Sequence, residues 1–149
     1  MNKKIIQSLK SYPRDMTGYG QNSFNPKWPN NAKVAVQFVL NYEEGGENCI
    51  LHGDNASEAF LSEIVGAKSY EGVRHMSMES IYEYGSRAGV WRILRLFKEF
   101  NIPITVFAVA LAIARNKELA DYLVEHNYDI CAHGFRWIDY QYVDENTER

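Results

Sequence analysis

Two short stretches of the sequence carry side chains that could catalyse hydrolysis. The stretch "NYEEGGEN" (41–48) places Glu43 and Glu44 directly after an apolar run, and "CAHGFRWIDY" (131–140) places His133 after another. Carboxylates and imidazoles are the groups that most often move protons in enzymes near neutral pH. We therefore identify Glu43 as the candidate general base and His133 as a second catalytic residue. Solvated loop acids and a structural histidine remain the alternative explanation.

Three further residues near these stretches could bind a substrate. Glu44 follows the candidate base, and Trp137 could form a pocket wall that stacks on a flat ring. Arg87 lies at the start of an expected helix, where the arginine and the first-turn amides could hold an anion or a polarised carbonyl. A salt bridge at the helix start explains Arg87 equally well.

The surrounding elements follow a β, excursion, α, β, α, β order. Buried strands are expected at 32–40, 104–109 and 128–131, because these runs are nearly continuous and apolar. The run 86–100 has the period of an amphipathic helix, and Asn116 is expected to cap a second helix that extends to about residue 126. The order predicts an α/β fold with a parallel sheet and crossover helices. Since catalytic groups of such sheets gather at the carboxyl ends of the strands, the two candidate stretches should meet on one rim.

The segments outside this pattern are less regular. Residues 1–31 include a run rich in Pro, Gly and Asn, and are expected to form an extended N-terminal arm lying on the domain. Residues 49–85 form a long excursion with one short helix candidate at 56–65. The sequence ends in "VDENTER" (143–149), which is typical of a first helical turn.

Composition excludes several classes of protein. The chain has 149 residues, 46% of them hydrophobic and 23% charged, which is the composition of one globular domain. The net charge of −3 without a basic run disfavours nucleic acid as a partner. The longest apolar run, 104–114, is too short to cross a membrane, and the N-terminus lacks a secretory signal. Cys49 and Cys131 have no metal or redox spacing, so a cytoplasmic protein is expected.

The chain resembles the N-terminal half of a polysaccharide deacetylase (NodB-type) domain, and most closely the metal-independent allantoinase branch of that family. The resemblance rests on the strings "YPRDMTGYG", "VAVQFVLNYEEGGEN", "HMSMESIYEYGSRAGVWRILRLF", "PITVFAVA" and "YDICAHGFRWIDY". It implies that residues 1–149 are the N-terminal part of a single domain, with the fold of a partial (β/α) barrel.

The resemblance also assigns roles to individual residues. The aspartate that acts as general base in the wider family falls on Glu43, and the aspartate that binds metal falls on Glu44. The two metal-binding histidines fall on His133 and Trp137. A catalytic zinc usually has three protein ligands, and indole cannot coordinate a metal. The resemblance therefore implies hydrolysis without a metal or other cofactor, in which the hydantoin ring of allantoin, a small ureide, opens to allantoate.

Two other functions stay open. One is a zinc-dependent deacetylase of N-acetylated sugars, which would use Glu44, His133 and a ligand from outside this chain. The other is a truncated, inactive fragment that serves as a binding or assembly module. The later motifs of the family are absent from the 149 residues, so the chain alone is expected to lack allantoinase activity. Its uncovered strand edge and helix faces are expected to drive self-association into a homo-oligomer.

Overall fold

The computed structural model describes residues 3–4, 7, 12–60 and 62–149, and it divides the chain into two compact units, 1–36 and 37–149. In the first unit, residues 3–4 and 7 are helical. Residues 12–36 contain one 3-10 turn, η1 (Pro29–Asn31), and are exposed throughout. Residues 12–31 of the predicted arm are thus largely irregular. Residues 1–2, 5–6 and 8–11 of the arm lie outside the described part, and its contact with the domain stays a prediction.

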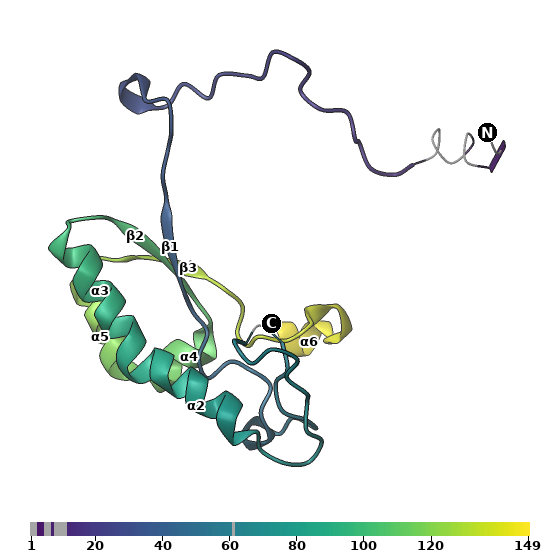
Figure 1. Cartoon of the computed structure of the whole chain (residues 1–149), viewed down its shortest axis with the longest axis vertical. Coiled ribbons are helices and arrows are strands. Elements are labelled where there is room, and N and C mark those ends of the chain that lie inside the picture. The colour runs from purple at the N-terminus through teal and green to yellow at the C-terminus, as the bar shows by residue number, and fades with distance from the viewer. Residues whose placement is uncertain (1–2, 5–6, 8–11, 61) are drawn as a thin grey trace. The chain divides into compact units, whose positions relative to one another are not determined.

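A three-stranded parallel sheet forms the centre of the second unit (Figure 1). Its strands are β1 (Phe38–Tyr42), β2 (Ile104–Ala108) and β3 (Asp129–Ala132), with β2 in the middle. Because all three strands run in the same direction, their carboxyl ends lie at one edge. This confirms the predicted α/β arrangement of a parallel sheet with helices.

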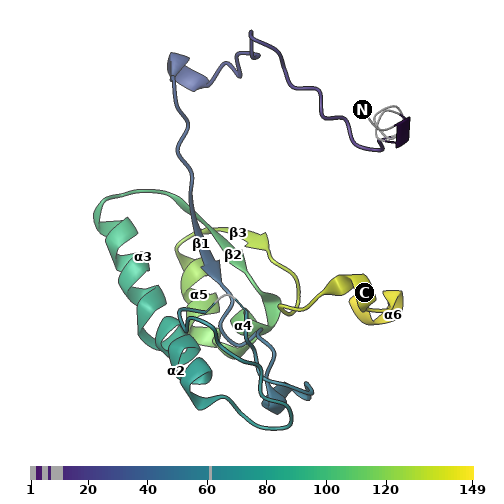
Figure 2. The same ribbon diagram turned by 45° about the vertical axis from the view of Figure 1, so that its right-hand side comes forward.

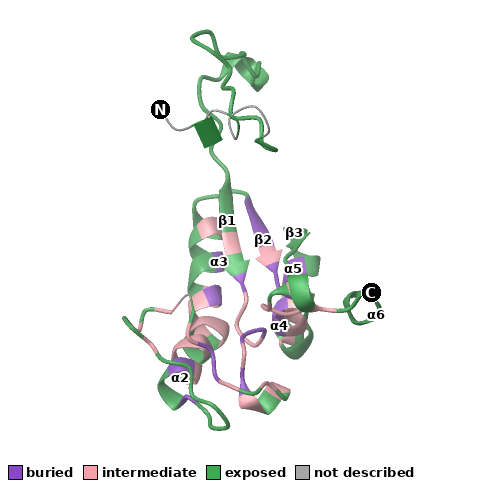
Figure 3. Ribbon diagram, turned by 90° about the vertical axis from the view of Figure 1, so that its right-hand side faces the viewer, coloured by how far each residue is buried: buried purple, intermediate pink, exposed green. Residues whose placement is uncertain are grey.

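The helices α3 (Val90–Glu99) and α5 (Lys117–Glu125) lie on the same side of the sheet (Figure 2). They contact each other through Trp91 and Tyr122, whose ring centroids are 5.3 Å apart. The core between them and the sheet includes Leu94, Leu119 and Leu123, each no more than 1% exposed. Burial of such a side chain contributes about 1.5–3 kcal/mol. Within the sheet, burial is greatest along β2, whereas all four residues of β3 are exposed (Figure 3).

Strand alternation gives the two faces of the sheet different roles. Leu40 and Val106 are paired in register and belong to the helix-facing side, with the core. Asn41 and Phe107, the next pair, point to the opposite face, as Cys131 does beside them. Glu43 and His133 follow the strand ends with the same alternation, so both belong to the face that the helices leave uncovered.

The predicted strand boundaries at 32–40 are wrong by several residues. β1 begins at Phe38 because its register partner is Ile104, the first residue of β2 after Pro103. Residues 32–37 have no partner strand among the described residues to complete a ladder. At the other end β1 continues to Tyr42, which pairs with Ala108. The predicted second strand ends one residue after β2 does. The predicted third strand begins and ends one residue before β3 does.

The helix predicted at 86–100 begins ten residues earlier. α2 (Met76–Tyr84) continues through a π-helical turn, η3 (Gly85–Gly89), into α3. His75 caps the start, because its side chain accepts a hydrogen bond from the Met78 amide. Arg87 therefore lies inside a continuous helical segment, not at a helix start. It has no free first-turn amides beside it.

The helix predicted at 56–65 is wrong within the described residues, and Leu61 of that range lies outside them. Ala56 forms an antiparallel bridge with Glu71, and the Ser57 amide donates to the Tyr70 carbonyl at 3.0 Å. The Glu58 carboxylate accepts hydrogen bonds from the two amides that follow it, at 2.9 Å each. These bonds use backbone groups that a helix would need.

The remaining helices agree better with the sequence. Asn116 caps α5 as predicted, through a 3.2 Å bond from the Leu119 amide to its side chain. The C-terminal turn is present as α6 (Glu145–Glu148). α4 (Ala110–Arg115) was not predicted, and two short 3-10 turns, η2 (Ile50–His52) and η4 (Tyr140–Tyr142), complete the unit. Among the described residues, no helix is both long and apolar enough to span a membrane.

Candidate functional site

Glu43 and His133 meet at the carboxyl edge of the sheet. The Nε2 atom of His133 lies 2.9 Å from Oε1 of Glu43, although 90 residues separate the two in sequence. The His133 amide donates to the Ala108 carbonyl at 3.0 Å, which ties the loop after β3 to the end of β2. The His133 ring also lies 5.7 Å, centroid to centroid, from the ring of Phe107. The predicted meeting of the two stretches on one rim is confirmed, with β2 between their strands.

A cavity of about 610 Å³ opens beside this pair. Glu43, Glu44 and Trp137 line it, so the structure brings these three predicted residues together. The other lining residues come from β1, from the loop after it, from the excursion and from the helical segment: Asn41, Glu47, Glu63, Ser80, Ile81, Tyr82, Tyr84 and Gly85. The cavity thus combines four carboxylates with three aromatic side chains.

Glu44 lies against the π-helical turn η3. Its Oε2 atom accepts a hydrogen bond from the Glu43 amide at 3.1 Å. Its carboxylate also lies against Gly85, where an added Cβ atom would stand 2.0 Å from Oε1. The absence of a side chain at Gly85 is therefore what allows the π-helical turn to approach Glu44. Burial raises the pKa of the Glu44 carboxyl, and the charges of Glu43 and Glu47 raise it further.

This raised pKa predicts a stability that depends on pH. A carboxyl whose pKa is higher in the folded than in the unfolded chain binds more protons when folded. The free energy of unfolding then falls as pH rises above the ordinary value of 4.5. Glu44→Gln removes this dependence, so we expect its Tm to exceed that of the unaltered chain at pH 8, with a gap that closes toward pH 4. Thermal unfolding followed by circular dichroism measures the Tm of the variant and of the unaltered chain at each pH.

Glu125→Gln, an exposed change on α5, controls for the loss of one formal charge. A Tm difference between Glu44→Gln and the unaltered chain that stays constant from pH 4 to pH 8 would contradict the assignment.

Trp137 forms part of the cavity wall. Its amide donates to the Gly46 carbonyl at 2.9 Å, which joins the loop after β3 to the loop after β1. Its ring lies 6.2 Å from that of Phe60, with an interplanar angle of 31°. The predicted place of Trp137 in the cavity wall is confirmed, and stacking on a flat ring of a substrate stays a prediction.

Arg87 does not line the cavity. Its side chain is 76% exposed and pairs with Glu83, one turn earlier, at 3.3 Å. The salt bridge considered as its alternative role is present, and a part in substrate binding stays a prediction.

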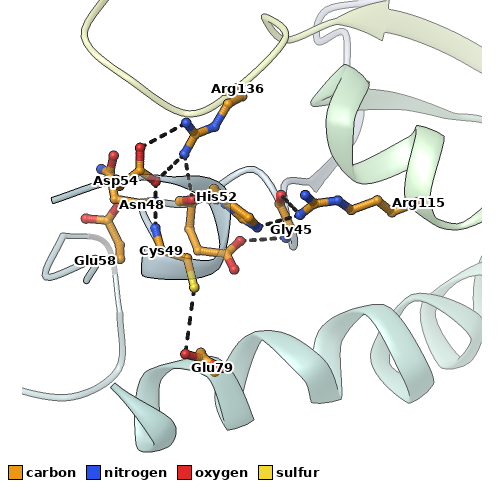
Figure 4. Close-up of polar contacts among 10 residues, drawn as sticks. Gly45, Asn48, Cys49, His52, Asp54, Glu58, Glu79, Arg115 and Arg136 are labelled. Carbon is orange, nitrogen blue, oxygen red and sulfur yellow. Dashed lines mark hydrogen bonds and ion pairs between the residues drawn. The ribbon is translucent and has the colours of Figure 1, made fainter. Parts of the chain in front are cut away.

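An ion pair between Arg136 and Asp54 braces the loop that carries the acids (Figure 4). The guanidinium is bidentate on Asp54, at 3.0 and 2.6 Å, and also donates to the Glu47 carbonyl at 3.1 Å. Asp54 in turn accepts from the Cys49 amide at 2.8 Å, and the arginine lowers the pKa of its carboxyl. The excursion is thereby attached to the loop after β3.

Arg115 of α4 supports the same loop from the other side. It donates to the Gly45 carbonyl at 2.9 Å and to the His52 ring (Figure 4). The other ring nitrogen of His52 lies 2.9 Å from the Glu47 carbonyl, and Glu47 itself accepts from the Gly45 amide at 2.6 Å. The loop after β1 is therefore held by hydrogen bonds from two sides, although its sequence is rich in glycine.

Asn41, Glu63 and Tyr82 line the cavity, although the sequence motifs did not predict them there. Asn41 could have been found, because the period-2 alternation of a strand places residues two apart on the same face, here Asn41 and Glu43. Burial, and then the nearby carboxylates, raise the pKa of the Tyr82 hydroxyl, so this group remains an O–H donor at neutral pH. No local sequence signal marks Glu63 or Tyr82, since their role depends on how the excursion folds.

The side chains at the family's metal positions do not fit a zinc ion. The Nε2 atom of His133 is hydrogen-bonded to Glu43, and the Glu44 carboxylate accepts a hydrogen bond from the Glu43 amide. The indole of Trp137 has no atom that can coordinate a metal. In the part of the chain that the structure describes, no three His, Cys, Asp or Glu side chains are arranged to hold a metal. Metal-independent action stays a prediction.

Comparisons with known proteins identify the family of the chain. The family model described as polysaccharide deacetylase matches residues 73–149. A Schizosaccharomyces pombe protein, named as a polysaccharide deacetylase by inference, is 44% identical over 138 residues, which are 91% of this chain and 43% of that protein.

Two solved structures are similar in both sequence and fold. A crystal structure of PuuE allantoinase is 62% identical with a TM-score of 0.84, over 92% of this chain and 45% of that one. A structure from Pseudomonas aeruginosa PAO1, also named as a polysaccharide deacetylase by inference, is 64% identical with a TM-score of 0.84. It is matched over 92% of this chain and 46% of its own. The chain thus spans less than half the length of these relatives.

Proposed function

Since the chain belongs to the polysaccharide deacetylase family, we propose that it carries the Glu43–His133 part of a hydrolase site that opens a cyclic ureide, as in the conversion of allantoin to allantoate. The observation that carries the proposal is the 2.9 Å contact between Glu43 and His133 beside a cavity lined by Trp137. The 62% identity to PuuE allantoinase supports this reaction in particular.

The reaction needs one water molecule and two proton movements. Glu43 takes a proton from the water as its oxygen bonds to the ring carbonyl carbon. The carbon–nitrogen bond then breaks, and the leaving nitrogen takes up the proton that Glu43 removed from the water, either directly or by way of His133, which lies within hydrogen-bond distance of Glu43. The carboxylic acid that forms releases its remaining proton to solvent. The products of the broken bond are a carboxylate and an N–H group. The Tyr82 hydroxyl, which stays protonated, is our candidate donor to the oxygen of the attacked carbonyl.

The charge of the cavity favours a neutral substrate that is rich in N–H groups. Carboxylates accept hydrogen bonds and donate none when ionised, and Glu47 and Glu63 line the cavity beside the candidate base. A ureide offers several N–H donors to such groups. The ring-opened product is an anion, so the same carboxylates repel it and favour its release.

We further propose that the three-stranded sheet is part of a (β/α) barrel. The parallel order β1-β2-β3 and the TM-score of 0.84 to the longer PuuE allantoinase support this architecture. In such a barrel the rim that carries Glu43 and His133 is the rim where active sites lie.

A substrate panel tests the function. The purified 149-residue chain, and any longer protein that contains it, are incubated with allantoin, with hydantoin and with N-acetylglucosamine oligomers. An active protein is expected to release allantoate from allantoin and to release no acetate from the N-acetylglucosamine oligomers. Acetate release that requires added zinc would favour the deacetylase alternative. Release of neither product by either protein would leave the binding-module alternative.

A further inference from the structure

Asn41 donates a hydrogen bond to the candidate base Glu43, a contact that no sequence motif assigns. We propose that Asn41 is a positioning residue, which selects the oxygen of Glu43 that meets the substrate. The inference rests on the proposed function, because it concerns the geometry of the same carboxylate. It is carried by the hydrogen bonds around Glu43.

Both donors to the Glu43 carboxylate reach the same oxygen. Asn41 Nδ2 donates to Oε1 at 3.1 Å, and His133 Nε2 lies 2.9 Å from that atom. Within residues 12–60 and 62–149, no hydrogen bond reaches Oε2. Two donors on one oxygen fix the plane of the carboxylate, and they leave Oε2 as the atom available to take a proton from water.

The backbone of both donors is tied to the sheet. Asn41 lies within β1, in register with Phe107 of the central strand. His133 follows β3 directly, and its amide is bonded to the Ala108 carbonyl. Glu43 lies beyond the last residue of β1 in a turn closed by a 2.9 Å bond from the Gly46 amide to its carbonyl. A glutamate side chain has three rotatable bonds, so donors fixed to the sheet restrict its orientation strongly.

Asn41→Asp is the sharpest test of this role. The change conserves size, but it removes the donor and sets a negative charge beside Oε1, which displaces the Glu43 carboxylate. We expect kcat for ureide hydrolysis to fall about 100-fold while KM changes less than about threefold, because a small misplacement of a catalytic group mainly slows the chemical step. Asn41→Ala, which only removes the donor, should lower kcat about tenfold.

Asn48→Asp is the matched control. Asn48 Nδ2 donates to Glu58 Oε2 at 2.8 Å, so the same substitution creates the same conflict between carboxylates. Neither residue lines the cavity that holds Glu43. The kcat of this variant should stay within about twofold of the unaltered protein, since the geometry of Glu43 is untouched.

Crystal structures of the unaltered protein, Asn41→Ala and Asn41→Asp separate this inference from the proposed function. We expect the Glu43 carboxylate to rotate away from its original orientation in both variants, while His133 stays in place. An unmoved Glu43 in both variants, or an unchanged kcat, would overturn the positioning role. If no ureide is hydrolysed by any protein, the proposed function fails, and the orientation of Glu43 in the three structures still decides the role of Asn41.

Discussion

Glu43→Gln is expected to lower kcat for ureide ring opening by about 10³-fold, because an amide cannot take a proton from the attacking water. The substitution conserves size, and the amide oxygen can still accept hydrogen bonds from Asn41 and His133 in the positions that Oε1 now has. The loss therefore reports on proton transfer more than on packing. Steady-state release of allantoate measures it, with the 149-residue chain and with any longer protein that contains it.

Glu63→Gln provides the matched control for this experiment. It makes the same chemical change to another carboxylate that lines the same cavity. We expect kcat to change by less than about fivefold, because Glu63 acts on substrate binding and not on the transferred proton. Equal losses in the two variants would show that the cavity needs its total charge and that Glu43 has no special role. More than a tenth of the original activity in Glu43→Gln would rule it out as the base.

Leu123→Ala is expected to destabilise the fold by about 2–5 kcal/mol, the range for a leucine removed from a packed core. Leu123 is 1% exposed and belongs to the cluster that joins α5 to β2. The surrounding side chains come from a sheet and two helices, which cannot collapse into the space left behind. Urea unfolding followed by circular dichroism gives the change in the free energy of unfolding. The total free energy of unfolding of a small domain is only about 5–15 kcal/mol, so this loss is a large part of it.

The neighbouring residue on α5 supplies the control. Val124 is 71% exposed, so Val124→Ala removes two methyl groups without opening a cavity. Its effect should lie within about 0.5 kcal/mol of zero, the usual range for surface changes. A comparable loss in both variants would mean that burial does not explain the effect of Leu123→Ala, since alanine has the higher helix propensity in both substitutions.

Much of the sheet could be predicted from the sequence because its signals are local. The apolar runs at 104–109 and 128–131 mark the positions of β2 and β3 closely, and Asn116 marks the start of α5. The expected burial is right for β2 and wrong for β3, whose four residues are exposed. A repeated order of strand and helix requires parallel pairing, and parallel pairing brings all carboxyl ends to one edge. The shared edge of Glu43 and His133 follows from this reasoning alone.

Other boundaries depended on partners that the sequence does not display. β1 begins at Phe38, not at residue 32, because Pro103 ends the loop just before its partner strand. The helix expected at 56–65 is replaced by a bridge to Glu71 and by bonds from backbone amides to the Glu58 carboxylate. Contacts with residues outside the segment here outweigh its intrinsic helix propensity.

The sequence by itself determined the fold class and the pair of residues at the rim, since both follow from the periodicity and order of short segments. Only the tertiary structure placed Glu44 against Gly85, which is distant in sequence, and gave its carboxyl a pKa that burial raises. Only the tertiary structure also brought Asn41 and His133 to one oxygen of Glu43. A pKa and a hydrogen-bond direction depend on every atom within a few ångströms, and most of those atoms come from segments far away along the chain.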